Sequence, residues 1–327
     1  MTATTLAMPR ARVPLARFAR GVAYSLRIRR PEFLVAEVPI VLLPALLMAT
    51  NTAQLRTGTF VEGLVVMYLL FNFGDMVNCL YDRDLDATYK PHLSRAVYGL
   101  GVAAVRWQIA VTAVAIVVLA AHLAAQLDRW LFVPGILAGL ALGAAYSRPP
   151  VRLKGRGVAQ LVTLWAIIFV GPMAFISMLL APMPSFQVAA VAIAYATVQM
   201  GIILLNTAED FTEDRAAAVK TTIVVLGLRR GVGLAASLVG IGGTLLFVLM
   251  FLTSRGAWAL SASMILGAVI LTVCGTLLRL HRTLTGEVSR DLPRVRRVAK
   301  LVPVALTLVA WTSLAVVYAA LQASGSR

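Results

Sequence analysis

Charged residues, cysteine and histidine are all scarce in this chain of 327 residues. Charged side chains make up 13% of it, whereas a soluble domain has about 25%. The two cysteines are too few for a disulfide framework. The three histidines are scattered and lack the spacing of zinc, haem or Ser-His-Asp sites. The composition therefore excludes a soluble globule and a secreted disulfide scaffold.

Long hydrophobic runs take the place of the missing charge. Hydrophobic residues make up 60% of the chain, and its mean hydropathy is +0.85. A helix crosses a bilayer with about 20 apolar residues and satisfies its own backbone hydrogen bonds there. Nine such spans are predicted, at residues 32–50, 59–82, 101–126, 130–147, 158–181, 186–208, 231–253, 257–279 and 300–322. The expected fold class is all-α, a polytopic integral membrane protein with nine transmembrane helices.

Basic residues are distributed unevenly between the predicted loops. The formal net charge is +16, which in a soluble protein would suggest a nucleic-acid partner. In the nine-span arrangement, 26 of the 30 lysines and arginines lie on one side, beginning with seven between Arg10 and Arg30. Positive loops stay in the cytoplasm, so we expect the N-terminus there and the C-terminus outside. The expected partner is the lipid bilayer, not nucleic acid, and the expected location is a bacterial inner membrane.

The chain shows no soluble domain and no long linker. Residues 1–30 contain many arginines and no continuous apolar core, unlike a cleavable signal peptide. We expect a basic cytoplasmic N-terminal segment at residues 1–30 and a single membrane-embedded domain at residues 31–327.

Acidic residues are concentrated in two short windows. Eight of the fourteen lie there, at the cytoplasmic ends of predicted spans. Each window has the spacing Asn-x-x-x-Asp-x-x-x-Asp, formed by Asn78, Asp82 and Asp86 in the first and by Asn206, Asp210 and Asp214 in the second. Residues four apart lie on one face of a helix, so each window predicts a ladder of one amide and two carboxylates. Carboxylates at membrane depth are costly and functional by default.

The two ladders predict a magnesium site. Mg²⁺ prefers oxygen ligands and keeps its other positions for water and substrate phosphates. We expect Asn78 and the four aspartates to bind Mg²⁺ around a diphosphate. Basic residues near the ladders could bind phosphate oxygens and stabilise a departing diphosphate. The candidates are Lys90, Arg95, Arg152, Lys154 and Lys220.

Asp75 lies three residues before Asn78. At about 100° per residue it falls within roughly 60° of the first ladder's face, one turn deeper in the membrane. We expect it to point into the same cavity and to contact the acceptor or accept its proton instead of binding Mg²⁺. The alternative is a packing role, with Asp75 hydrogen-bonded to a neighbouring helix.

These windows and the segment between them resemble the UbiA superfamily of intramembrane prenyltransferases. Asn78, Asp82 and Asp86 match the family's first aspartate-rich motif, and Asp210 and Asp214, followed by the run from Lys220 to Gly227, match the second. The stretch Tyr146-Ser147-Arg148-Pro149-Pro150-Val151-Arg152-Leu153-Lys154 is similar to the family's Tyr-Ser-x-Pro-Pro-x-Arg-x-Lys segment. The resemblance covers about residues 30–320.

The resemblance implies a Mg²⁺-dependent enzyme with nine helices around a central cavity. Such an enzyme moves an isoprenyl group from a polyprenyl diphosphate to a small, most often aromatic acceptor through an allylic carbocation. It implies the four motif aspartates as catalytic residues, and the helix geometry above adds Asp75 to them. The residues expected to bind the diphosphate are Asn78, Lys90, Arg95, Tyr146, Ser147, Arg152, Lys154, Asn206 and Lys220.

Two departures from the family pattern leave the acceptor open. Members that prenylate quinone precursors usually carry an Arg-x-x-Arg-Pro-Leu type run after the first motif, whereas this chain has Tyr89-Lys90-Pro91-His92-Leu93-Ser94-Arg95. Cys79 stands where the family often has aspartate. One alternative is a UbiA-type terpene cyclase, which needs no acceptor. Another is an ion-coupled transporter or channel, which predicts acidic residues deep in several spans.

Overall fold

The computed structural model describes residues 12–325. Residues 1–11, with Arg10 of the basic segment, and residues 326–327, with Arg327, lie outside the described residues. Within residues 12–325 the chain is almost wholly helical, and its one sheet has two strands of two residues each. The all-α fold class is confirmed.

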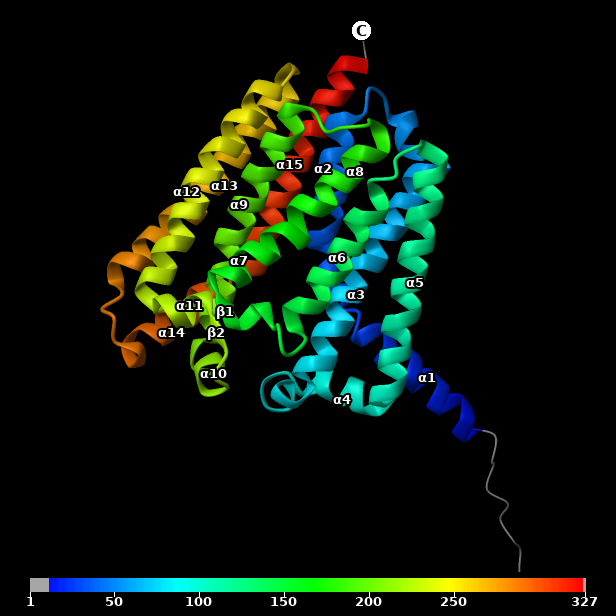
Figure 1. Ribbon diagram of the computed structural model, residues 1–327. Coiled ribbons are helices and arrows are strands. Elements are labelled where there is room, and N and C mark those ends of the chain that lie inside the picture. Colours follow the sequence, from blue (N-terminus) through cyan, green and yellow to red (C-terminus); the bar gives the residue numbers. More distant parts are fainter. Residues whose placement is uncertain (1–11, 326–327) are drawn as a thin grey trace, which may run out of the picture.

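The long helices lie side by side along one axis (Figure 1). Eight segments of the described chain are long and apolar enough to cross a membrane: Pro31–Met48, Gly58–Tyr89, Val102–Leu127, Val158–Leu180, Phe186–Glu209, Leu228–Thr253, Gly256–Thr283 and Val302–Ala323. The fourth predicted span corresponds to a shorter apolar helix of 16 residues, α6 (Phe132–Ser147). The eight segments together with α6 agree with the nine predicted spans.

Most spans are single helices, and the first and fifth are composite. The single ones are α3 (Gly58–Tyr89), α5 (Val102–Leu127), α9 (Phe186–Glu209), α12 (Leu228–Thr253), α13 (Gly256–Thr283) and α15 (Val302–Gly325). The first span is η1 (Pro31–Phe33) with α2 (Leu34–Met48), and the fifth is α7 (Val158–Leu164), η4 (Trp165–Val170) and α8 (Gly171–Leu180). The middle part of the fifth span, η4, is a π-helical turn, a feature frequent at functional sites.

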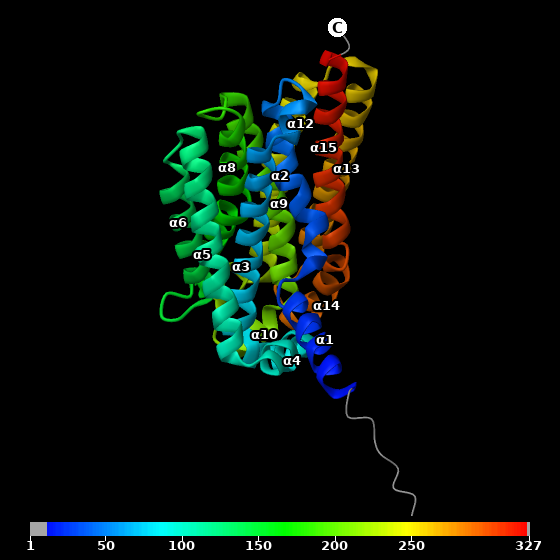
Figure 2. The ribbon, with the colours of Figure 1, turned by 90° about the vertical axis from the view of Figure 1, so that its right-hand side faces the viewer.

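Short elements gather at one end of the bundle. They are α1 (Arg12–Arg27), α4 (Pro91–Leu100), η3 (Leu153–Gly155), β1 (Arg156–Gly157), α10 (Phe211–Ala216), β2 (Lys220–Thr221), α11 (Thr222–Leu226) and α14 (Val288–Ala299). Figure 2 shows α1, α4, α10 and α14 at this end, opposite the end at which α15 finishes. The short η2 (Thr52–Arg56) joins α2 to α3.

Apolar side chains cover much of the outer surface. On α5, for example, Val111, Val114 and Val118 are 61%, 63% and 59% exposed. A soluble monomer does not expose continuous apolar faces of this kind, whereas lipid tails accept them. The protein is therefore an integral membrane protein.

Glycines allow α9 and α12 to approach closely at the centre of the bundle. A Cβ atom on Gly201 would lie 2.8 Å from Val239 Cγ2 and 2.9 Å from the carbonyl oxygen of Ala235. One on Gly242 would lie 2.9 Å from Thr197 Cβ and 3.0 Å from the backbone nitrogen of Val198. Membrane helices use small residues in this way because close packing replaces the hydrophobic effect between them.

We expect Gly242→Ala to destabilise the protein by about 1–3 kcal/mol, the cost of overpacking a tight contact. Gly240→Ala on the same helix is the matched control, since its new Cβ would meet Cys274 Sγ at an ordinary 3.5 Å. Thermal unfolding in detergent should give a lower midpoint for Gly242→Ala alone. Equal midpoints for the two variants would show that α9 and α12 do not depend on this close contact.

Candidate active site

The first acidic window occupies the last turns of α3, which has 32 residues. At 1.5 Å per residue, α3 is about 48 Å long, whereas the hydrocarbon layer is about 30 Å thick. Its end therefore extends beyond the apolar layer. Asn78, Asp82 and Asp86 line one polar cavity of about 200 Å³, so the expected helical ladder is present. The helix ends at Tyr89 and α4 begins at Pro91, a residue suited to the first turn of a helix.

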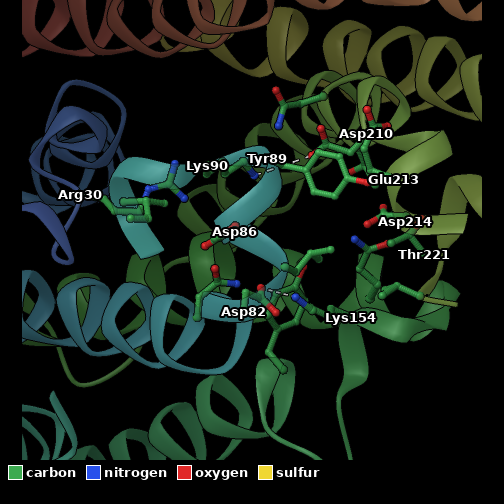
Figure 3. A pocket seen from close by; sticks show the side chains of 18 residues that line it. Arg30, Asp82, Asp86, Tyr89, Lys90, Lys154, Asp210, Glu213, Asp214 and Thr221 are labelled. Atoms are coloured by element: carbon green, nitrogen blue, oxygen red, sulfur yellow. Dashed lines mark hydrogen bonds and ion pairs between the residues drawn. The ribbon is translucent and has the colours of Figure 1, made fainter. Parts of the chain in front are cut away.

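The second acidic window is not a continuous helix. α9 ends at Glu209, Asp210 has φ −88° and ψ 14°, and α10 begins at Phe211. The expectation of a second straight ladder is therefore wrong. The amide of Asp214 still donates to the carbonyl of Asp210 at 2.8 Å. Asn206, Asp210 and Asp214 all line the same polar cavity as the first window (Figure 3).

The loop after α6 brings cations to the first window. Arg148 is extended and two prolines follow it, so the helix cannot continue past Ser147. Lys154 Nζ then forms a buried ion pair with Asp82 Oδ2, and Arg152 Nη2 lies 3.5 Å from Asp82 Oδ1. Asn78 Nδ2 donates to Ser147 Oγ at 3.2 Å. Both ends of the Tyr146–Lys154 segment thus contact the ladder on α3.

A small parallel sheet connects the loops of the two windows. β1 pairs with β2, with Arg156 opposite Lys220 and Gly157 opposite Thr221. The buried Thr222 donates its hydroxyl to the Gly157 carbonyl at 2.8 Å, and its amide donates to Gln160 Oε1 at 2.9 Å. This pairing places Thr221 in the wall of the polar cavity.

Lysines form ion pairs with some carboxylates of the polar cavity and leave other carboxylates without a counter-charge. Lys90 Nζ lies 3.8 Å from Asp210 Oδ2 and links the two windows, but both side chains are about half exposed, so the pair adds little stability. Asp86 and Asp214 form no ion pair within residues 12–325. Burial and the negative charge of Asp210 raise the pKa of Asp214 to about 6, against opposing effects of the Thr221 hydroxyl and two lysines. Negative charge is therefore only partly compensated here.

The donor set of the cavity fits a hard divalent cation. Within the described chain, no three His, Cys, Asp or Glu side chains come close enough to hold one metal ion by themselves. The available donors are carboxylate and amide oxygens on two facing walls, and Asp82 Oδ1 is buried without a hydrogen-bond partner among residues 12–325. Mg²⁺ characteristically takes one or two carboxylates and completes its shell with water and substrate phosphates.

A larger apolar cavity of about 430 Å³ adjoins the polar one. Arg30, Asn78, Tyr146 and Asn206 line both cavities. The walls of the apolar cavity come from α2, α3, α6, α9 and α15, and from the π-helical turn, which contributes residues 167–169. Asp75 lines this apolar cavity, whereas Asp82 and Asp86 line only the polar one. The expectation that Asp75 shares one cavity with the whole ladder is therefore wrong, since Asn78 is the one residue of the first ladder that shares a cavity with it.

Most of the residues predicted from the sequence meet around the polar cavity. Nine line it: Asn78, Asp82, Asp86, Lys90, Tyr146, Lys154, Asn206, Asp210 and Asp214. Ser147 and Arg152 contact ladder residues. Arg95 and Lys220 are exposed and do not line the cavity, and Arg95 Nε donates to the Pro91 carbonyl of its own helix at 3.1 Å. Diphosphate contacts of these two residues stay predictions.

Several residues of the site are not predicted from the sequence. Arg30, Gln160, Glu213 and Thr221 also line the polar cavity. The charge distribution alone assigns Arg30 only a role in topology. Its backbone has a left-handed φ of 48° just before Pro31. The Arg-Pro pair at the start of an apolar run was the available signal for it. Glu213 lies in the second acidic window beside Asp214, whereas Gln160 and Thr221 come together only through the pairing of distant loops.

Arg296 on α14, which no sequence motif singles out, holds the second window in place. Its Nε donates to the carbonyl of Glu209, the last residue of α9, at 3.1 Å. Its Nη2 donates to Thr212 Oγ1 at 3.3 Å and forms an ion pair with Glu213. Burial raises the pKa of Glu213, but hydrogen bonds from Thr212, its own backbone amide and Arg296 outweigh it, and the pKa is below its ordinary value. A cation at a helix C-terminus is favourable.

We expect Arg296→Gln to weaken diphosphate binding about tenfold or more, because hydrogen bonds to charged groups contribute about 1.5–3 kcal/mol each and α10 would be released. The measurement is the KM for the diphosphate in a turnover assay. Arg297→Gln, the next residue along α14, is the control because no bond to α10 depends on it. An unchanged KM in Arg296→Gln would show that α10 holds its position without this residue.

Comparison with known proteins shows the family of this chain. The model of the UbiA prenyltransferase family matches residues 38–289. The chain belongs to this family. It is 26% identical over 227 residues to the bacteriochlorophyll synthase 33 kDa chain of Rhodobacter capsulatus, an alignment that covers 67% of this chain and 69% of the relative. The protein is therefore a membrane-embedded prenyltransferase.

Solved structures share the fold at low sequence identity. A UbiA homologue of Archaeoglobus fulgidus bound to DMAPP and Mg²⁺ has a TM-score of 0.58 at 20% identity, over 90% of this chain and 99% of that one. A digeranylgeranylglyceryl phosphate synthase has a TM-score of 0.63 at 13% identity, also over 90% and 99%. The fold is thus common to these proteins over about nine-tenths of this chain.

Proposed function

We propose that the protein uses Mg²⁺ to transfer an isoprenyl group from a polyprenyl diphosphate to a small aromatic acceptor. This proposal rests mainly on one observation, which is that a polar and an apolar cavity adjoin and that four residues line both of them. An isoprenyl diphosphate has the same division into a charged head and a long apolar tail. The Archaeoglobus fulgidus homologue solved with GPP and Mg²⁺ supports this assignment.

The polar cavity is proposed to hold the diphosphate between the two acidic windows. Asn78 and the aspartates at 82, 86, 210 and 214 would hold Mg²⁺, which neutralises diphosphate charge and so makes it a better leaving group. Lys90 forms an ion pair with Asp210, and Lys154 forms one with Asp82. Both ammonium groups could move from these carboxylates to phosphate oxygens. Asn206 and Tyr146 would then position the first carbons of the isoprenyl group where the two cavities meet.

The apolar cavity is proposed to hold the isoprenyl chain and the acceptor. When the allylic C–O bond breaks, its electron pair leaves with the diphosphate, and an electron pair of the acceptor forms the new bond. Burial in an apolar cavity protects the carbocation from water, and the ring face of Tyr146 can stabilise it. The acceptor must finally lose a proton, and Asp75 in the cavity wall is proposed to accept it or to contact the acceptor.

Product analysis of the purified protein tests this function. Farnesyl diphosphate labelled with ¹⁴C, Mg²⁺ and a panel of phenols and aromatic acids should give a labelled adduct that mass spectrometry identifies. Labelled hydrocarbon formed without any acceptor would instead establish a terpene cyclase. Ion flux in liposomes without turnover of the diphosphate would establish the transport alternative.

The proposed orientation places the site and the N-terminus in the cytoplasm of a bacterial cell, at the inner membrane. α1 and the acidic windows lie at one end of the bundle, and α15 finishes at the other (Figures 1 and 2). A reporter fused after residue 327 should therefore behave as periplasmic or extracellular. A fusion after residue 151, in the loop beside the polar cavity, should behave as cytoplasmic. The reverse pattern would invert the proposed orientation.

A further inference from the structure

The hydroxyl of Tyr146 lies between the two acidic windows. Tyr146 is near the end of α6 and lines both cavities. Asp82 of the first window and Asp214 of the second both lie close enough for their charges to act on this hydroxyl. The diphosphate is proposed to occupy the same place. The direction in which the hydroxyl points therefore decides whether Tyr146 can donate a hydrogen bond to that ligand.

The side chain of Gln160 forms a hydrogen bond with the Tyr146 hydroxyl. Gln160 is on α7, is 6% exposed and also lines the polar cavity. The amide group of a glutamine carries an oxygen, which accepts hydrogen bonds, and a nitrogen, which donates them. The atom of Gln160 that faces Tyr146 thus determines whether the tyrosine oxygen accepts or the tyrosine proton is donated in this bond.

Thr222 fixes the orientation of the Gln160 amide. The backbone N–H of Thr222 donates to Gln160 Oε1 at 2.9 Å. A backbone N–H is only a donor, so the oxygen of Gln160 must face it. Thr222 is itself held, because it is fully buried and its hydroxyl donates to the Gly157 carbonyl at 2.8 Å, in the strand that pairs with β2. A reversed amide would set two donors against one another in a buried place, which is costly.

The amide nitrogen of Gln160 is therefore the atom left for Tyr146. It donates to the hydroxyl oxygen, which keeps one proton of its own to donate. That proton points away from Gln160, because a donor already occupies the side of the oxygen that faces the amide. The groups on the other side belong to the polar cavity. Diphosphate oxygens are acceptors, so they match this free O–H.

We propose that Gln160 is a positioning residue, which holds the Tyr146 hydroxyl as a hydrogen-bond donor to the diphosphate. The inference rests on the proposed prenyl transfer and adds a residue that acts on it through Tyr146. When the allylic C–O bond breaks, its electron pair stays with the diphosphate, whose oxygens become more negative. A hydrogen bond donated to them is therefore stronger in the transition state than in the bound substrate. The tyrosine keeps its proton throughout.

A double-mutant cycle tests the positioning role. Tyr146→Phe removes the hydroxyl and keeps the ring, and should lower kcat about tenfold or more, as expected for a lost hydrogen bond to a charged group. The KM for farnesyl diphosphate should change less. Gln160→Glu keeps an oxygen for the Thr222 N–H but has no amide nitrogen. It should lower kcat at least about fivefold more when residue 146 is tyrosine than when it is phenylalanine.

The cycle separates positioning from other effects of the substitution. An added charge or a loosened fold acts in both backgrounds, whereas positioning acts only where the hydroxyl is present. Gln160→Met, which adds no charge, should show the same dependence on the background. Gln126→Glu is the matched control, since Gln126 is exposed on α5 outside both cavities, and it should leave kcat unchanged. Equal losses in the two backgrounds, or an unchanged kcat in Tyr146→Phe, would overturn the proposal.

Binding of an unreactive analogue separates this inference from the proposed function. Isothermal titration of farnesyl thiodiphosphate with Mg²⁺ into the same four proteins of the cycle should show the coupling in Kd as well, at least about threefold. Wild-type protein that binds the analogue but forms no product with any acceptor would contradict the proposed function. The Kd values would then decide on Gln160 alone, and independent effects of the two substitutions on Kd would overturn its positioning role.

Discussion

Asp210→Asn is expected to lower prenyl transfer by at least about a hundredfold, the scale on which loss of one group that stabilises developing charge reduces turnover. The variant keeps the size of the side chain and removes a proposed Mg²⁺ ligand. Its ion pair with Lys90 is half exposed at 3.8 Å, so the fold should survive its loss. Initial rates with labelled farnesyl diphosphate and a fixed acceptor give the measurement.

Asp84→Asn is the matched control for this prediction. Asp84 belongs to the first acidic window but lies off the ladder, pairs with Arg83 at 3.4 Å and does not line the polar cavity. Its substitution should cost less than about threefold in rate, as expected of a surface ion pair. Equal losses in Asp84→Asn and Asp210→Asn would mean that general negative charge, and not the lining of the cavity, supports activity.

Asp82→Asn should be equally inactive but less stable. Asp82 is buried and compensates Lys154 and Arg152, and removing one partner of a buried pair costs about 3–5 kcal/mol. The double variant Asp82→Asn with Lys154→Met removes the stranded charge. It should recover much of the thermal stability and none of the activity. Recovery of activity in the double variant would show that Asp82 serves only to neutralise Lys154.

Asp75→Asn is expected to lower turnover by about a hundredfold or more, the contribution of a positioned general base. The KM for the diphosphate and the dependence on Mg²⁺ should change little, because Asp75 lines the apolar cavity and not the polar one. Steady-state kinetics with each substrate varied in turn separate these effects. Unchanged turnover with a lower unfolding temperature would assign Asp75 to packing instead.

The parts of the site carried by one helix could be predicted from the sequence. Spacing of four residues placed Asn78, Asp82 and Asp86 on one face of α3 because the helix continues through Tyr89. The same spacing failed at Asp210, where α9 ends and α10 starts in a new direction. Spacing along a chain carries no information on where a helix breaks when no proline or glycine marks the place.

Contacts between distant segments could not be predicted in this way. Arg296 reaches Glu209 and Glu213 across more than eighty residues of chain, and a run of loop arginines gives no sign of which one does so. Likewise, Glu37 and Asp75 lie on separate helices and line one cavity only because the bundle packs α2 and α3 around it. Composition predicted the class of protein and its spans, whereas the walls of both cavities depend on tertiary packing.

The most direct test of the account is the binding of farnesyl diphosphate to the purified protein with and without Mg²⁺. Isothermal titration in detergent would compare wild-type protein, Asp210→Asn and Asp84→Asn. The account predicts tight binding only with Mg²⁺, its loss in Asp210→Asn and its retention in Asp84→Asn. Equal binding in EDTA and in Mg²⁺, or full binding by Asp210→Asn, would contradict the claim that the two acidic windows hold the diphosphate through a divalent cation.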